Sequence, residues 1–325
     1  MAGGIYASPI RGFAFTVIST VFLGVTNIYI PFFGLISTFV WAAPTAVLTV
    51  REGVRTGILG VFTAGAFLAL FTTPVWAALA AAQFGALGLI MGFLFRKGTH
   101  AGQIIITGTV ISILTTGLLF FLPFLLSQGQ EGLVGTLENS AQEITQLWEN
   151  TGVMDQLRQQ GLDASEIQAS IKSAVKWIVR LFPSILVVTA AATAFINFLV
   201  ARGTLFKAGV PVSSFPAFRR WFLPWYISWG VIFGLGITLL GDYVKNETLL
   251  VLGQNILYLH FPVIFTIGLS VIVFFYHKAK SRLLTWVVVF AAIFYLPVTI
   301  FLLLLVGVFD PLFDFRKVHF KKNKG

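Results

Sequence analysis

The sequence predicts an all-α, polytopic membrane protein with about nine transmembrane helices. Hydrophobic residues make up 57% of the 325-residue chain and charged residues make up 10%, whereas soluble domains carry about 25% charged residues. Mostly apolar runs follow one another along the chain, close to the length of about 20 residues that a bilayer crossing needs. The short loops between these runs hold most of the positive charge, as is typical of membrane proteins.

The apolar runs divide into a glycine-rich group of six and a further group of three. We expect residues 1–202 to form a six-helix membrane bundle, with an extracellular helical insertion at 127–171. A basic cytoplasmic loop (203–222), a three-helix membrane region (223–317) and a basic tail (318–325) follow. No small-residue cleavage site follows the first run, so we expect a retained helix and not a signal peptide. The predicted spans are residues 12–30, 33–50, 54–71, 75–95, 103–126, 177–200, 223–240, 249–276 and 283–308.

The charged loops predict the orientation of the chain. Basic residues fall in alternate loops, whereas the insertion has seven acidic residues and a single basic one, Arg158. Because Lys and Arg favour the cytoplasmic side, we expect a multi-pass protein of the plasma membrane with its N-terminus in the cytoplasm. Nine spans place the basic tail outside, against the same rule. The alternative is that the last run enters the membrane and returns around Pro297.

The chain carries no residue pattern typical of an enzyme or a metal site. It has no cysteine, and its four histidines are scattered without ligand spacing. The Gly-x-x-x-x-Gly-Lys-Ser/Thr loop, the Gly-x-Ser-x-Gly elbow and the His-Glu-x-x-His motif are absent. We therefore expect no catalytic activity, cofactor or metal. Topology and anionic lipid explain the net charge of +10, so we expect no binding of nucleic acid.

Polar residues within apolar spans are the candidates for ligand binding. Asn27, Gln83 and Arg180 fall in the outer half of the predicted bilayer, and Trp76 lies at its outer edge. A small-molecule cavity open to the outside requires such a shared depth, so we expect these four residues to line one. The alternatives are amide hydrogen bonds between helices, snorkelling of Arg180 to the headgroups and an interfacial aromatic belt that includes Trp76.

Two basic loops provide the candidates for partner binding, Arg51 with Arg55 and Arg219 with Arg220. The second pair lies in the run FPAFRRWFLP, residues 215–224. Aromatic residues interleaved with arginines are typical of a segment on the membrane surface. Docking of a cytoplasmic protein is the alternative.

Glycines four residues apart predict close helix packing. Gly53 and Gly57 form one such pair, and Gly88 and Gly92 form another; small residues let helix backbones approach closely in lipid. We expect them to pack the protein's own bundle, with docking of a partner subunit as the alternative.

The last predicted span ends in FDPLFDFRK, residues 309–317, where two carboxylates meet two cations. We expect Asp314 and Arg316 to pair with each other or to cap the bundle. This ending and the run at 215–224 resemble segments of the YybS family of bacterial membrane proteins, whose function is uncharacterised. The resemblance extends over most of the chain.

The first six spans also resemble the substrate-binding (S) components of energy-coupling-factor vitamin transporters. The residues that carry this likeness are REGVRTG at 51–57 and the glycine-rich run from Gly85 to Gly92, which ends in Phe95, Arg96 and Lys97. The resemblance implies a bundle that binds a small nutrient and docks on a transmembrane coupling protein with ATPases. The chain departs from the family in its three extra spans and in a first span without the Ala-x-x-x-Ala docking motif.

Two functions follow from these observations. The first is a membrane-embedded subunit that binds or transports a small solute, with Asn27, Trp76, Gln83 and Arg180 as its lining. The second is a membrane scaffold or regulator that does not transport and instead binds partner proteins.

Overall fold

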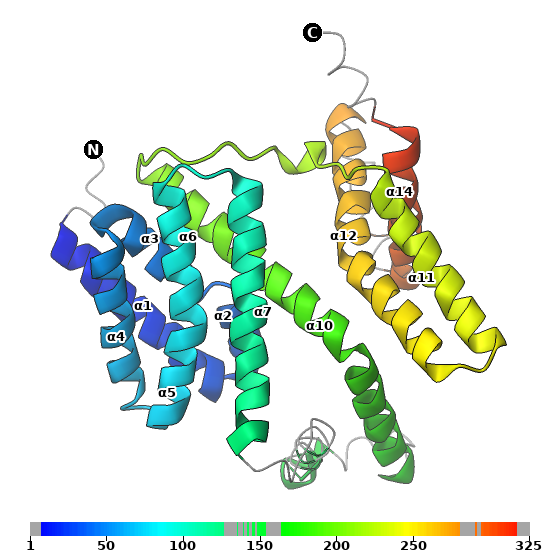
Figure 1. Ribbon diagram of the computed structural model, residues 1–325, viewed down its shortest axis with the longest axis horizontal. Coiled ribbons are helices and arrows are strands. Elements are labelled where there is room, and N and C mark those ends of the chain that lie inside the picture. Colours follow the sequence, from blue (N-terminus) through cyan, green and yellow to red (C-terminus); the bar gives the residue numbers. More distant parts are fainter. Residues whose placement is uncertain are drawn as a thin grey trace. The chain divides into compact units, whose positions relative to one another are not determined.

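The computed structural model describes residues 8–126, 164–279 and 294–316, together with positions 135, 139, 142, 145–146, 148–153 and 290. Every regular element that these residues form is a helix (Figure 1). Most of the predicted insertion at 127–171, and all of the tail at 318–325, lie outside this set.

Seven helices in the described part of the chain are long and apolar enough to cross a membrane. The protein is therefore an all-α polytopic membrane protein, as predicted. A shorter apolar helix, α4 (Val54–Leu68), adds to them. The seven are α1 (Pro9–Tyr29), the segment Pro74–Arg96, α7 (Ala101–Leu126), α10 (Ala164–Lys207), α11 (Tyr226–Tyr243), α12 (Glu247–Ala279) and α14 (Leu296–Phe313).

The chain forms two compact units, which we describe one at a time. The first contains Met1–Thr136 and Leu186–Phe215, and the second contains Leu137–Ile185 and Pro216–Gly325. Helix α10 supplies residues to both units. This division follows packing, whereas the predicted boundaries at residues 202 and 222 follow loop charge and stay a prediction.

In the first unit, the predicted span 33–50 is interrupted. It consists of α2 (Pro31–Thr38) and α3 (Ala43–Glu52), with residues 39–42 in turns between them. The interruption places Trp41 in the core, where its Nε1 donates to the carbonyl oxygen of Thr20 at 2.9 Å. Pro44 lies in the first turn of α3, where its missing N–H would have no helical partner. The prediction of one continuous helix is therefore wrong here.

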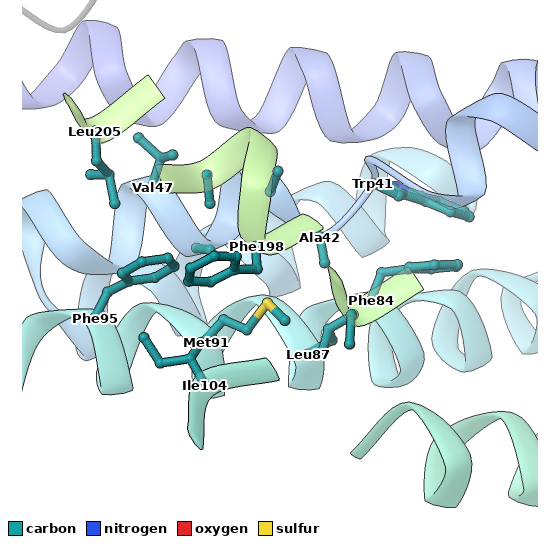
Figure 2. Packing of buried hydrophobic residues seen from close by; sticks show 14 of the residues in the cluster. Trp41, Ala42, Val47, Phe84, Leu87, Met91, Phe95, Ile104, Phe198 and Leu205 are labelled. Atoms are coloured by element: carbon teal, nitrogen blue, oxygen red, sulfur yellow. The ribbon is translucent and has the colours of Figure 1, made fainter. Parts of the chain in front are cut away.

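The core of the first unit is a layer of aromatic and aliphatic side chains (Figure 2). Phe95 and Phe198 stack with ring centroids 5.3 Å apart, and Trp41 stacks on Phe84 at 4.2 Å. Such pairs add to the free energy gained by burying large apolar side chains. Phe198 and Leu205 are fully buried, so α10 contributes centrally to this core.

Glycines bring helix α6 (Ala86–Arg96) against α3. A methyl group added at Gly88 would lie 2.7 Å from the carbonyl oxygen of Ala42, and one added at Gly92 would lie 2.7 Å from that of Ala46. The two helix backbones therefore touch at both positions. The expected role of this glycine pair in packing the bundle is confirmed.

The fourth predicted span contains a π-helical turn. Helix α5 (Pro74–Ala80) continues through η1 (Ala81–Gly85) into α6. A π turn inserts one extra residue into the helix and often occurs at functional sites. Gln83 lies in this turn.

In the second unit, α11 and α12 form an antiparallel hairpin. Gly241 lies against the backbone of Leu250 at the end of the hairpin, and Gly234 lies against Ile256 further along. Helix α14 crosses α12 at two further glycines. A methyl group at Gly268 would overlap the carbonyl oxygen of Leu303, and one at Gly307 would overlap that of Ile264.

Helix α14 runs in the same direction as α12. Ser228, in the first turn of α11, donates to the carbonyl oxygen of Val308 at 2.9 Å, and Arg316 donates to Ser270 in the second half of α12. The C-terminal ends of α12 and α14 thus lie together, at the orange and red ends in Figure 1.

This direction corrects the predicted ninth span. The described helix begins at Leu296, and residues 280–289 and 291–293 lie outside the described set. A ninth span over 283–308 placed Arg316 across the membrane from Arg219. That placement is wrong, because Nη1 of Arg316 donates to the carbonyl oxygen of Arg219 at 3.1 Å. The described part of this run, Leu296–Phe313, is still long and apolar enough to cross a membrane.

Candidate functional site

The guanidinium of Arg316 holds together three parts of the second unit. Nε and Nη2 donate to the two carboxylate oxygens of Asp310, at 3.3 and 2.7 Å. Nη1 donates to the carbonyl oxygen of Arg219 at 3.1 Å and to Oγ of Ser270 at 2.9 Å. Nη2 also donates to the carbonyl oxygen of Trp221 at 2.6 Å. All five N–H donors of an arginine are therefore used.

The end of α14 brings Arg316 back to Asp310. Asp314 has φ 44° and ψ 56°, a left-handed conformation, and its N–H donates to the carbonyl oxygen of Asp310 at 2.8 Å. A left-handed residue at this place ends a helix and reverses the chain. The expected ion pair between Asp314 and Arg316 is therefore replaced by one between Asp310 and Arg316.

Arg316 contacts a short segment, residues 216–221, that we call the arginine loop. Its centre is the 3-10 turn η2 (Phe218–Arg220). Oγ of Ser270 donates to the carbonyl oxygen of Phe218 at 2.7 Å, and Nε1 of Trp221 donates to that of Pro216 at 2.9 Å. Together with the two bonds from Arg316, these contacts fix four carbonyl groups of the loop.

The loop presents arginine side chains on a fixed backbone. Arg220 is exposed and Arg219 is half-buried. The Asp310 and Arg316 side chains are only 3% and 1% exposed, respectively. Because the donors of Arg316 are all occupied by protein groups, its role is to hold the loop. The guanidinium groups of Arg219 and Arg220 are not part of this network.

Two of the four residues predicted to line a solute cavity make hydrogen bonds inside the first unit. Nδ2 of Asn27 donates to the carbonyl oxygen of Gly34 at 2.9 Å and to Oγ1 of Thr38 at 2.7 Å. Nε2 of Gln83 donates to Oγ1 of Thr116 at 2.8 Å. The alternative of interhelical hydrogen bonding thus describes both residues, since Asn27 joins α1 to α2 and Gln83 joins η1 to α7.

The third predicted residue, Trp76, packs on the core. Its ring lies 5.9 Å from that of Trp41, which stacks in turn on Phe84. The cavity beside these rings has a volume of about 10 Å³, which is room for one water molecule. Its lining includes Oγ1 of Thr20, which is buried and has no hydrogen-bond partner within the described residues.

The fourth predicted residue, Arg180, belongs to the second unit and forms an ion pair with Glu247. The backbone around it is completed by Asn255. Nδ2 of Asn255 donates to the carbonyl oxygen of Arg180 at 2.8 Å, and its Oδ1 accepts from the N–H of Ser184 at 3.1 Å. The amide thus bridges the helical step next to Pro183, where the α10 hydrogen-bond ladder is interrupted.

The remaining predicted partner residues lie in the first unit. Arg51 is half-buried in the last turn of α3, and Arg55 is exposed in the first turn of α4. From the sequence, Asp310 was one of the two carboxylates at the end of the last predicted span, but the partner expected for Arg316 was Asp314; Ser270 was not a candidate. Asp310 carried a usable signal, because an ionisable residue near the end of an apolar span is a functional candidate; Ser270 carried none.

These elements define a polytopic, all-α membrane protein in whose second unit a buried ion pair joins the end of α14 to α12 and to the arginine loop. The chain belongs to the family described as predicted membrane protein (DUF2232), which matches residues 17–311. It is similar to the uncharacterized protein YybS of Bacillus subtilis (strain 168), with 25% identity over 301 residues. That alignment covers 89% of this chain and 91% of the relative. No solved structure matches the chain.

Proposed function

We propose that the protein is a membrane scaffold or regulator that binds an acidic partner protein through the arginine loop. The observation that carries this proposal is that Arg316, itself held by Asp310 and Ser270, donates to two carbonyl groups of the loop's backbone. A buried ion pair is costly to form, and here it fixes a short segment that presents Arg219 and Arg220.

The chemistry of the loop suits carboxylates. A guanidinium offers planar, bidentate hydrogen bonds that match a carboxylate group. A backbone that is already ordered loses less conformational entropy when a partner binds. The ring of Phe218 packs on Trp221 at 4.9 Å, so an aromatic pair lies beside the arginines, as in many binding hot spots.

The contacts of the predicted solute residues favour this function over solute binding. Asn27 and Gln83 donate to other protein groups, and the cavity beside Trp41 has room for one water molecule. Binding or transport of a solute, with coupling to ATPases, stays a prediction from the sequence. The membrane surface is the other candidate occupant of the arginine loop.

Crosslinking in cells tests the proposal. A photo-crosslinking amino acid at Ala217, which is exposed in the loop, is expected to capture one acidic protein reproducibly. Arg219→Glu and Arg220→Glu are each expected to lower the capture about tenfold, because like charges at an interface repel. Lys278→Glu is the matched control, since Lys278 is also exposed and lies near the end of α12.

Two outcomes would refute the proposal. If Lys278→Glu lowers capture as much as Arg220→Glu, the effect is general attraction and not recognition by the loop. If the crosslinker captures only lipid in every variant, the loop is a membrane-surface segment. Normal abundance of each variant in the membrane shows that the protein still folds.

A further inference from the structure

An open cleft lies at one end of the first unit, where α3 ends and α4 begins. Its volume is about 510 Å³, and it is lined by residues 52–55 of the α3–α4 connection and by Phe93, Arg96 and Lys97 at the end of α6. Gly53 joins the two helices with φ +97°, a conformation that favours glycine. The walls of the cleft are therefore set by a tight connection between two packed helices.

The lining of the cleft is strongly basic. Three cations, Arg55, Arg96 and Lys97, face one carboxylate, Glu52, which gives a formal charge of three minus one, or +2. All three cationic residues are exposed. Nη1 of Arg96 lies 2.9 Å from the place where a Cβ at Gly53 would be, so the guanidinium rests against the glycine backbone.

The start of α4 adds to the positive potential of the cleft. Gly53, Val54 and Arg55 all line it, and among the residues that the structure describes no side chain caps the first N–H groups of this 15-residue helix. Backbone N–H groups and the helix dipole at such a terminus favour anions. The helix terminus and the three cationic side chains thus both attract an anion to the cleft.

The cleft also borders an apolar surface. Phe93 is 41% exposed and lines the cleft, and Nζ of Lys97 lies 4.4 Å from the centre of its ring. Ile58 and Phe62 are exposed on α4. A ligand with a charged group in the cleft can therefore place an attached apolar chain along the surface of these helices.

We propose that this cleft binds the phosphate group of an anionic ligand. Arg55 and Arg96 supply bidentate hydrogen bonds, Lys97 supplies a mobile point charge, and the start of α4 supplies backbone donors. The phosphate belongs either to an anionic lipid headgroup or to a soluble phosphate compound. The proposal concerns the first unit and does not depend on the arginine loop.

Native mass spectrometry of the full chain tests the proposal and separates the two sources. In one arm, the protein is released from nanodiscs of phosphatidylcholine that contain a minor share of phosphatidylglycerol. In the other, it is titrated with pyrophosphate in nanodiscs of phosphatidylcholine alone. Retention of phosphatidylglycerol identifies a lipid source, and saturable binding of pyrophosphate identifies a soluble one; either result supports the phosphate site.

Matched variants decide whether the cleft is responsible. Arg55→Gln and Arg96→Gln are each expected to weaken binding of the phosphate probe, whether phosphatidylglycerol or pyrophosphate, about tenfold. Each substitution removes charge-assisted hydrogen bonds. Arg11→Gln, at an exposed arginine on α1, removes the same charge and is expected to leave binding unchanged. Equal binding by all variants, equal loss with Arg11→Gln, or no binding of either probe would overturn the proposal. Unfolding temperatures are measured alongside, so that loss of fold is recognised.

Discussion

Arg316 and Asp310, six residues apart in sequence, form a bidentate ion pair in which both side chains are almost fully buried. Removal of one partner leaves the other as an unpaired buried charge. We therefore expect Arg316→Met to lower the free energy of unfolding by about 3–5 kcal/mol. Titration with a denaturing detergent, followed by tryptophan fluorescence, measures this change.

Two further variants test the physical reason. The double variant Asp310→Leu with Arg316→Met removes both charges and is expected to regain much of the lost stability, as apolar replacements of buried pairs often do. Arg220→Met, at an exposed arginine, is expected to change stability by less than about 0.5 kcal/mol. An Arg316→Met variant as stable as Arg220→Met would contradict the interpretation.

Asn255 is expected to be needed because it completes the backbone of α10. In Asn255→Leu, the carbonyl oxygen of Arg180 and the N–H of Ser184 lose their partner, which costs about 1–3 kcal/mol. Gln254→Leu is the neighbouring control, since the Oε1 of Gln254 is buried without a hydrogen-bond partner in the described part of the chain. It should leave stability unchanged or raise it. A larger loss at residue 254 than at residue 255 would refute the bridging role.

The close crossing of α12 and α14 predicts a strong effect of one methyl group. Gly307→Ala places a carbon against the backbone of Ile264, which cannot move independently of its helix, so we expect a loss of about 1–3 kcal/mol. Gly236→Ala in α11 meets nothing within 4 Å and should be neutral or stabilising by up to about 1 kcal/mol. Detergent unfolding of both variants compares them directly. Equal stability would show that the crossing is looser than the structure indicates.

The shared direction of α12 and α14 predicts the result of a labelling experiment. The chain has no cysteine, so single cysteines report on their own positions. Phe315→Cys is expected to react with a membrane-impermeant thiol reagent from the same side as Ala217→Cys. Asp242→Cys, at the far end of α11, should react from the opposite side. Labelling of positions 315 and 242 from one side would contradict the parallel arrangement.

Hydropathy predicted the existence of the long helices because each needs only an apolar run of sufficient length. It missed the interruption at residues 39–42, since residues 33–50 are mostly apolar and carry no charged residue. The break depends on a contact with another helix, the hydrogen bond from Trp41 to Thr20. Such a contact leaves no trace in a sliding average.

The candidate sites were harder to predict for a related reason. Depth in the membrane is a single coordinate, so the shared depth of Asn27, Gln83 and Arg180 said nothing about their separation around the bundle. The pair of Asp310 and Arg316 does not follow the three- or four-residue spacing of helical neighbours. It depends on the left-handed conformation of Asp314, and a sequence without glycine at that position gives no indication of such a turn.

The composition of the first unit has a consequence for biosynthesis. Its core needs Phe198 and Leu205, which the ribosome adds long after α1 to α7 have been made. Until then, the early helices are in the bilayer without the α10 side chains that complete their core, and the apolar surface that α10 will cover contacts lipid or insertion factors. A chain arrested before residue 186 is therefore expected to be a preferred target of membrane proteases, whereas one arrested well beyond residue 215 is expected to survive.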